Sequence, residues 1–332
     1  MLSIRRLVEV SFCLAVLAAS VPAGAQGVGR TWLSQRVGEL KTEVDYGVTG
    51  SCNRDVKDQD AELALIRHSF HVFAPLWQNE REEVAARISV DAWDVDTEAR
   101  LTRPNVELPE HLWDLQFGGM WRRKLDNGWI VGAGVEVGSP SDKPFDSCEE
   151  TSVNAMGSLR MPAGERDAWL FFVQYSNNRS FLPHVPIPGV AYQWVPDPKR
   201  FRAVVGVPFS QLYAEPIDRL YVQLRYLLVR QVHAEIGYRV LDTLNIYAAF
   251  DWDNNRFFRA GRRENDDRIF YYEKRLTTGV RWEVCEGLTA DIFGGYAFDR
   301  FFFEGEKYDD RDQSRIDVAD GAFIGIKASY RF

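Results

Sequence analysis

The segment ADGAFIGIKASYRF, residues 319–332, alternates regularly between two kinds of side chain. Apolar residues occupy every second position from Ala322 to Tyr330, and the sequence ends on Phe332. The positions between them are mostly small or polar, as at Lys327. A period of two is typical of a β-strand with one apolar face. Because free C-termini usually fray and favour small polar residues, we expect this strand to be held on both sides in a sheet.

The same alternation recurs in the part of the chain that precedes this segment. Most of these runs have about nine to eleven residues, the length of a tilted strand that crosses a bilayer. Short connections (241–243 and 285–287) alternate with long polar ones (254–268 and 301–315). Short turns at one end and long loops at the other are typical of outer-membrane barrels. The alternating runs are 232–240, 244–253, 276–284 and 287–299.

Weaker strand patterns continue toward the N-terminus, and together they predict an all-β chain. We expect a transmembrane, antiparallel, up-and-down β-barrel of about 14 strands, with about 12 as the alternative. Residues 43–50 are a weak strand, and the Pro-rich residues 178–199 are expected to form a long connection. An even strand number places both ends of the barrel at the periplasmic side. The additional strands are 43–50, 61–74, 83–95, 111–124, 128–138, 151–161, 167–177, 200–209 and 218–228.

A soluble β-sandwich is the alternative, because its strands also alternate. It would need polar outer faces, but many of those positions carry Gly, Ala, Phe or Tyr. Aromatic residues make up 13% of the chain and cluster at both ends of the apolar runs. Two aromatic girdles are expected where a barrel meets the two membrane surfaces. The girdle residues are Trp282, Tyr330 and Phe332 at one end and Phe250, Trp252, Tyr296 and Phe298 at the other.

Residues 1–25 have the pattern of a secretory signal peptide. Arg5 and Arg6 precede an apolar stretch at 10–19, and an Ala-Gly-Ala cleavage site follows at 23–25. We expect a periplasmic lead-in at 26–42, a barrel at 43–332 and localisation in the bacterial outer membrane. Removal of the signal peptide changes the formal charge from −8 to −9. An acidic exported chain is a poor candidate for binding nucleic acid.

Two further patterns resemble known families. The ending Tyr330-Arg331-Phe332 resembles the C-terminal signature of bacterial outer-membrane barrels, which implies recognition of Tyr330 and Phe332 by the barrel-assembly machinery. Residues 185–192, 270–275 and 295–306 resemble an uncharacterised family of predicted outer-membrane barrels. That resemblance implies topology and contact with outer-membrane lipids. It implies no activity, since none is established for the family.

The sequence carries no strong motif for a cofactor or a metal. GAGVEVG, residues 132–138, has the wrong spacing for a dinucleotide loop, and no helix pattern follows it. We therefore expect no cofactor and no metal. Cys52 and Cys148 both fall in expected external loops, where an oxidising environment permits a disulfide. Two unpaired thiols are the alternative.

One serine and one histidine allow a hydrolase hypothesis. Ser69 and His71 are two residues apart, so on a strand both side chains point to the same face. A lipid hydrolase needs the base within hydrogen-bond reach of the nucleophile. No orienting acid or amide is evident in the sequence, so the hypothesis stays an alternative and the chain is not expected to be an enzyme.

The face opposite the apolar one carries many charges on the five C-terminal strands. These residues could line a solute path, or they could pair with one another and stiffen a narrow barrel. We expect a porin-like passive channel or small-solute transporter with a mixed-charge lumen and long external loops. The alternatives are a structural or surface-binding barrel with a plugged lumen, and an outer-membrane lipid hydrolase. The candidate lumen residues are His233, Glu235, Arg239, Asp251, Glu273, Arg275, Arg281, Glu283, Asp291, Asp299, Lys327 and Arg331.

Overall fold

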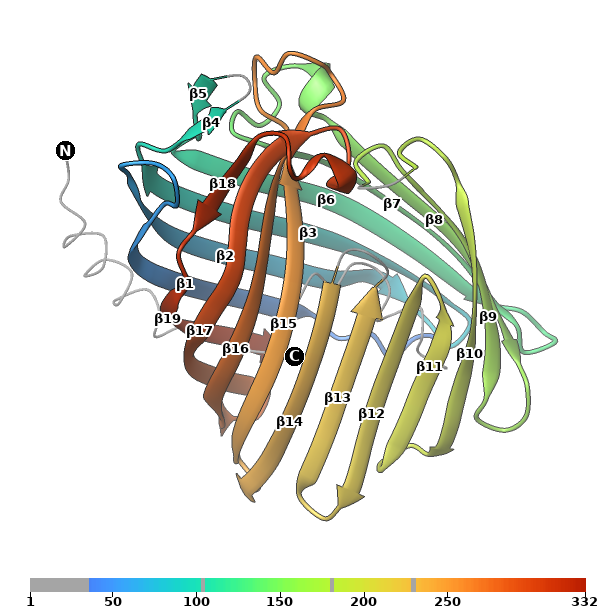
Figure 1. Cartoon of the computed structure of the whole chain (residues 1–332). Coiled ribbons are helices and arrows are strands. Elements are labelled where there is room, and N and C mark those ends of the chain that lie inside the picture. The colour runs from blue at the N-terminus through green and yellow to red at the C-terminus, as the bar shows by residue number, and fades with distance from the viewer. Residues whose placement is uncertain (1–35, 103–104, 180–181, 228–230) are drawn as a thin grey trace.

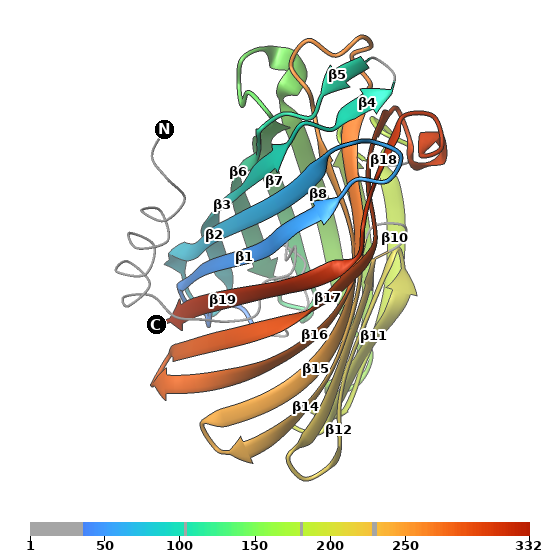
Figure 2. The same cartoon turned by 60° about the vertical axis from the view of Figure 1, so that its left-hand side comes forward.

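The chain forms a closed antiparallel β-barrel with 16 strands in the ring (Figure 1). The structure is a computed structural model that describes residues 36–102, 105–179, 182–227 and 231–332. The ring closes where β1 pairs along its length with β19, the segment that ends the sequence (Figure 2). The expected signal peptide and most of the expected lead-in lie outside the described residues.

The ring strands follow the chain in order, each paired with the next. They are β1 (Glu43–Asp55), β2 (Glu62–Gln78), β3 (Glu82–Thr97), β6 (His111–Lys124), β7 (Ile130–Ser141), β8 (Ser152–Pro162), β9 (Ala168–Ser176), β10 (Ile187–Asp197), β11 (Phe201–Val207), β12 (Phe209–Ile217), β13 (Leu220–Leu227), β14 (Gln231–Leu241), β15 (Leu244–Phe257), β16 (Arg268–Cys285), β17 (Leu288–Gly305) and β19 (Gly321–Arg331).

Five small elements lie at the end of the barrel that carries the long loops. A hairpin of β4 (Arg100–Thr102) and β5 (Asn105–Glu107) follows β3, and β18 (Arg315–Val318) pairs with the last residues of β17. Two short 3-10 turns, η1 (Cys148–Glu150) and η2 (Tyr308–Asp310), lie in the loops after β7 and β17. These elements stand above the ring and cover part of its opening.

The strand number is a correction of the prediction: the ring has 16 strands, not about 14 or 12. The expected long connection at 178–199 contains β10, which includes Pro188 and Pro196. The expected single strand 200–209 covers β11, and β12 follows after only one residue, Pro208. Proline favours turns and sheet edges, so these residues suggested a loop where the chain forms two more strands.

The expected alternation of apolar and polar faces is present on the barrel strands. Large apolar side chains point outward and remain exposed, with Ile292 61% and Ile324 68% exposed. A soluble sandwich would bury such a face between two sheets. A continuous outer belt of exposed Ile, Val, Leu and aromatic side chains instead fits contact with hydrocarbon, and the closed ring leaves no unpaired edge.

The wall of the barrel differs in height around the ring (Figure 1). β16 and β17 have 18 residues each, whereas β11, β12 and β13 have 7, 9 and 8. The loops at 142–151 and 258–267 extend the wall further, but only Pro208 joins β11 to β12 at the same end. The long-loop end is therefore tall on one side and low over β11–β13.

Aromatic rings lie flat against the inner wall opposite glycines. Tyr247 pairs across the strands with Gly279, and a Cβ on this glycine would lie 2.6 Å from the Tyr247 Cζ. Tyr221 covers Gly237 in the same way, at 2.2 Å from the equivalent Cβ position. Glycine permits this close approach because it has no side chain. The pairing keeps both rings on the wall and directs their hydroxyl groups along it.

Candidate functional site

The interior carries two connected groups of charged side chains, and the first is centred on Arg281 of β16. Its Nη1 donates to Glu235 Oε1 at 3.1 Å, and its Nε donates to Asp291 Oδ2 at 3.1 Å. Tyr221 donates to Glu235 at 2.9 Å, and Tyr247 donates to Asp291 at 3.0 Å. Each buried carboxylate therefore has both a cation and a hydroxyl partner, as buried charges require.

The second group crosses the interior of the barrel. Arg67 of β2 donates to Glu273 of β16, although β17, β19 and β1 stand between these two strands. Tyr271 also donates to Glu273, at 2.7 Å, and Arg275 pairs with Asp253 at 2.9 Å. This cross-barrel ion pair narrows the side of the lumen that lies between β16 and β2.

Most predicted lumen residues are partners in these groups or beside them. His233 contacts Asp251 at 2.7 Å between Nδ1 and Oδ1, and Arg239 pairs with Glu215 at 2.9 Å. Lys327 has a buried Nζ without a hydrogen-bond partner among the described residues. Glu283 is exposed near the short-turn end, where Arg331 pairs with Glu43 across the β1–β19 seam.

Asp299 is a correction, because it does not join the interior charges. Its Oδ2 accepts from Lys274 Nζ at 2.7 Å, and Lys274 shares a face with the outward-pointing Leu276. The register between β16 and β17 shifts next to Asp299, whose φ is +52°. A bulge re-aims the residues that follow it, so simple alternation fails at this point.

Sequence reasoning missed several partners in these groups. Arg67 lies on an N-terminal strand, and its contact with Glu273 depends on how the ring closes. The sequence does not identify Tyr221 and Tyr247 as such partners, because aromatic residues in a barrel are expected in the membrane girdles rather than in polar contacts. Their positions opposite Gly237 and Gly279 are a signal that pairing of the strands could have revealed.

The serine and histidine of the hydrolase hypothesis face the interior rather than the lipid. His71 Nδ1 lies 2.5 Å from Ser89 Oγ, its partner directly across the β2–β3 ladder, so it contacts Ser89 instead of Ser69. His71 Nε2 lies 3.7 Å from Asp91. These three side chains are enclosed by the barrel wall, which does not favour the action of a base on membrane lipids.

The cysteines and the possible metal ligands of the described ranges form no cluster. Cys52, on β1, and Cys148, in η1, are free, exposed thiols, so the predicted disulfide is not formed here. Four inter-strand steps of roughly 4.8 Å separate β1 from β7, whereas bonded cysteines need Cα atoms within about 7 Å. In the described part of the chain, no group of three His, Cys, Asp or Glu side chains could hold a metal ion.

An arm of the barrel wall folds over the long-loop end. We call it the lid: residues 256–272 of β15, β16 and their loop, with residues 300–305 of β17. Its root is the part next to the ring, with Phe257, Ile269, Tyr271 and Phe302. The inner face of the root packs on β2, β3, β6 and the β4–β5 hairpin. Trp93 makes edge contacts with Phe257 and Tyr271, at 5.0 and 5.2 Å between ring centres. The buried residues of this contact are Val56, Leu63, Leu65, Trp93, Val95, Ala99, Leu101, Leu108, Leu112, Phe257, Ile269, Tyr271, Phe302, Ile316 and Val318.

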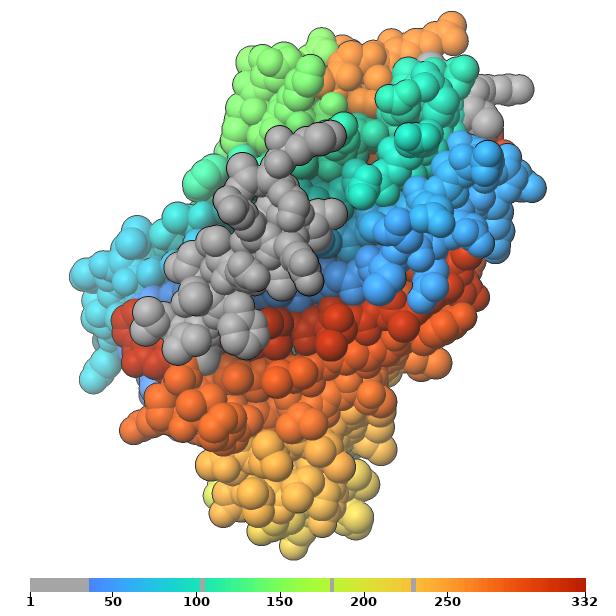
Figure 3. Space-filling view, turned by 90° about the vertical axis from the view of Figure 1, so that its left-hand side faces the viewer, coloured from blue at the N-terminus to red at the C-terminus, as the bar shows by residue number. Residues whose placement is uncertain are grey.

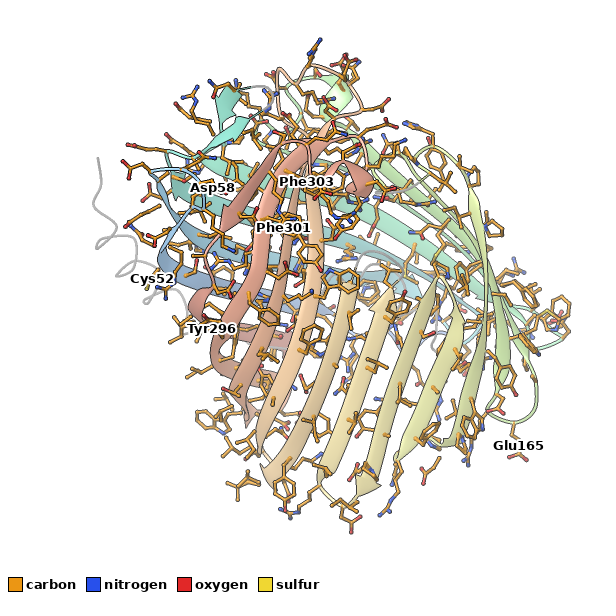
Figure 4. The ribbon with its side chains drawn as sticks, in the orientation of Figure 1. Cys52, Asp58, Glu165, Tyr296, Phe301 and Phe303 are labelled. Carbon is orange, nitrogen blue, oxygen red and sulfur yellow. The ribbon has the colours of Figure 1, made fainter. Side chains whose placement is uncertain are left out.

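The outer face of the lid carries a second aromatic cluster. Phe270 and Phe303 stack at 4.5 Å between ring centres, and Tyr272 stacks on Phe301 at 4.7 Å. Figure 4 shows Phe301 and Phe303 on the upper part of β17, above Tyr296 on the outer wall. Tyr308 of η2 covers this cluster. The lid is thus supported by buried aromatic contacts on both faces.

The tip of the lid, residues 258–262, reaches the opposite wall. Phe258 N donates to Pro140 O at 2.6 Å, although seven ring strands separate β15 from β7 in either direction. Arg262 Nη1 pairs with Glu150 Oε1 at 2.9 Å, and Arg262 Nη2 donates to Glu149 O at 2.9 Å. The space-filling view shows the loop after β15 against the loop after β7 (Figure 3). The long-loop opening is therefore bridged from wall to wall.

Acid is expected to weaken the contact at the tip. Burial acts to raise the pKa of Glu150, but hydrogen bonds from Ser147 and Arg262 and the guanidinium charge hold this pKa below its ordinary value of 4.5. A depressed pKa stabilises the closed contact above pH 4.5, and this stabilisation is lost as the pH falls through the lowered pKa. We expect the tip contact to break more often below pH 4.5, measured as a longer distance between spin labels on the loops 142–151 and 258–267. Glu150→Gln should remove most of this pH dependence; an unchanged acid response in the variant would contradict the assignment.

No helix in the described ranges is long and apolar enough to cross a bilayer. No family model and no curated protein matches the chain. Similar solved structures include an outer membrane channel from Pseudomonas putida F1, at 11% identity, with 96% of this chain and 98% of that chain covered and a TM-score of 0.38. OccK2 of Pseudomonas aeruginosa matches at 8% identity, with 90% of this chain and 99% of that chain covered and a TM-score of 0.38. A Pseudomonas aeruginosa FadL homologue matches at 12% identity, with 87% of this chain and 89% of that chain covered and a TM-score of 0.35.

At these scores, the comparisons carry no argument about function. The closed ring, the exposed apolar belt and the asymmetric loops define the class: the chain is a bacterial outer-membrane β-barrel, located in the outer membrane. The short turns then face the periplasm and the lid faces the exterior. The closer resemblance to one uncharacterised family stays a prediction.

Proposed function

We propose that this barrel is a gated channel or transporter for small polar solutes, and that its lid must move before solutes pass. The observation that carries the proposal is the kind of contact at the tip of the lid. Besides the buried Phe258 ring, it consists of one buried ion pair and several hydrogen bonds, and water can replace these polar contacts. A barrel with a purely structural role would need no polar contact of this kind at its outer opening.

The interior supports passage of polar solutes once the lid has moved. The charges on β13–β17 are held by one another and by tyrosine hydroxyl groups, so they remain on the wall. Flat rings over Gly237 and Gly279 keep the same wall free of protruding bulk. A path along this side would present both signs of charge, and it would avoid the side that Arg67 and Glu273 cross.

Conductance in planar bilayers tests the proposal. The purified chain is expected to stay mostly closed near neutral pH and to show brief current steps. Absence of any current at all voltages, including in variants that lack the tip contact, would contradict a channel.

A sealed structural barrel is the second candidate. Its supporting observation is the buried core at the root of the lid together with the cross-barrel pair of Arg67 and Glu273. The two candidates give opposite results with the same material. Weakening the tip should open the channel, whereas a barrel plugged by its core should stay closed.

A further inference from the structure

A cavity of about 490 Å³ lies at the periplasmic end of the barrel, on the inner face of β11, β12 and β14. Its lining residues lie at the short-turn ends of β11, β12 and β14, and Figure 1 shows these strands in the low part of the wall. Its volume is within the range of small-molecule sites. Its charged and aromatic lining consists of Lys199, Arg200, Arg202, Tyr213, Glu215 and Arg239.

The cavity has an excess of positive charge. Four cationic side chains and one carboxylate line it. Arg239 binds this carboxylate, Glu215, through two nitrogens at 2.9 and 3.1 Å, which neutralises it. Arg200 pairs with Asp218 at 2.5 Å, outside the lining. Within the described ranges, Lys199 and Arg202 have no ion-pair partner.

Arg202 is held in place by a ring contact, and among the residues that the structure describes it donates no hydrogen bond. Its Cζ lies 4.5 Å from the ring centre of Tyr213, which is a cation–π contact. Tyr213 is itself fixed, because its hydroxyl accepts from Arg239 at 2.9 Å. A guanidinium that stacks on a ring presents its planar set of N–H groups to a ligand, and this set matches two oxygens of a carboxylate or phosphate.

We propose that this cavity is a binding subsite for a small oxyanion, with Arg202 and Lys199 as its recognition residues. A carboxylate or a phosphate group would bind the N–H edge of the Arg202 guanidinium and the ammonium of Lys199. The excess of cations would not suit a neutral sugar or a cation. The inference deepens the proposed function, because it names small organic or inorganic anions as the solute class.

Calorimetric titration of the detergent-solubilised full chain tests the subsite without requiring conduction. Inorganic phosphate and succinate are the two probes, each titrated at the same ionic strength in chloride. At least one should bind, and the stronger probe tells phosphate from carboxylate recognition. Arg202→Gln and Lys199→Gln should each weaken binding about tenfold, because each removes a charged hydrogen bond.

Two further variants make the result specific. Lys124→Gln removes one positive charge from an exposed position on β6, at the same end of the barrel as the cavity. This variant should bind the probes within about twofold of the parent's affinity. Arg202→Lys keeps the charge but loses the planar donor set, so it should retain only part of the affinity. All variants should keep the parent's unfolding midpoint.

The outcomes separate this inference from the proposed function. Binding that depends on Arg202 supports the subsite even if the barrel never conducts. Failure of both probes to bind overturns it, and so does binding that is equal in the parent and in Arg202→Gln. A conducting barrel with either of those results would leave the channel proposal intact and remove the oxyanion site.

Discussion

Arg262→Gln is expected to raise the open probability of the barrel by about two orders of magnitude. The Arg262 and Glu150 side chains are 2% and 5% exposed in the closed state. Removing one partner of such a pair leaves a buried charge without compensation, at a cost of about 3–5 kcal/mol. The carboxylate regains water only if the tip leaves the loop after β7. Since about 1.4 kcal/mol is a factor of ten, the shift toward the open state should be at least about 100-fold.

Single-channel recordings would measure this change. Arg263→Gln is the matched control, because Arg263 is the next residue and is exposed. It should leave the open probability unchanged within about twofold, as expected for an exposed charge. The double variant Arg262→Gln with Glu150→Gln should open less often than Arg262→Gln alone, because no buried charge then remains unpaired. Equal traces for Arg262→Gln and Arg263→Gln would rule out the tip contact as the gate.

Arg281→Leu is expected to destabilise the barrel by about 3–5 kcal/mol. Arg281 is the cation shared by Glu235 and Asp291, whose side chains are 3% and 6% exposed. Without it, two carboxylates would remain close together without their shared cation, although tyrosine hydroxyls would still donate to both. Urea-induced unfolding in detergent, followed by tryptophan fluorescence, would measure the loss.

Arg331→Leu is the control for this effect. Its pair with Glu43 is also between a ring arginine and a carboxylate, but the arginine side chain is 50% exposed. Exposed pairs contribute about 0–1 kcal/mol, so the midpoint should move little. If Arg281→Leu moved it equally little, water would already screen the interior pairs and the wall would be more hydrated than its burial indicates.

The sequence predicted the fold class and the faces of the C-terminal strands. The alternation from His233 to Lys327 places apolar residues outside wherever the strands run without a bulge. It fails at Asp299, because one bulge reverses the faces beyond it. It also fails at β10 and β12, where proline-containing stretches join the sheet. The alternation along one segment indicates a strand and its two faces, but it does not indicate which strand pairs with it.

The contacts that close the barrel could not be predicted from such patterns. Arg262 and Glu150 are 112 residues apart, and both lie in loops without periodicity. The same holds for Arg67 and Glu273, which approach only after the ring has formed. Such contacts depend on the circumference of the ring and on strand length, so an error of two strands moves every partner across the barrel.

The lid is attached by unlike interactions at its two ends, and in the proposed gate this asymmetry would set the direction of its motion. Acid neutralises Glu150 at the tip and leaves apolar contacts such as those of Trp93 with Tyr271 intact. Only the tip is released under those conditions, while the root acts as a hinge. The lid would rotate about its root. A gap would then open between its tip and the loop after β7, next to the low part of the wall at β11–β13. A solute that enters there would descend along the wall that leads to Arg202.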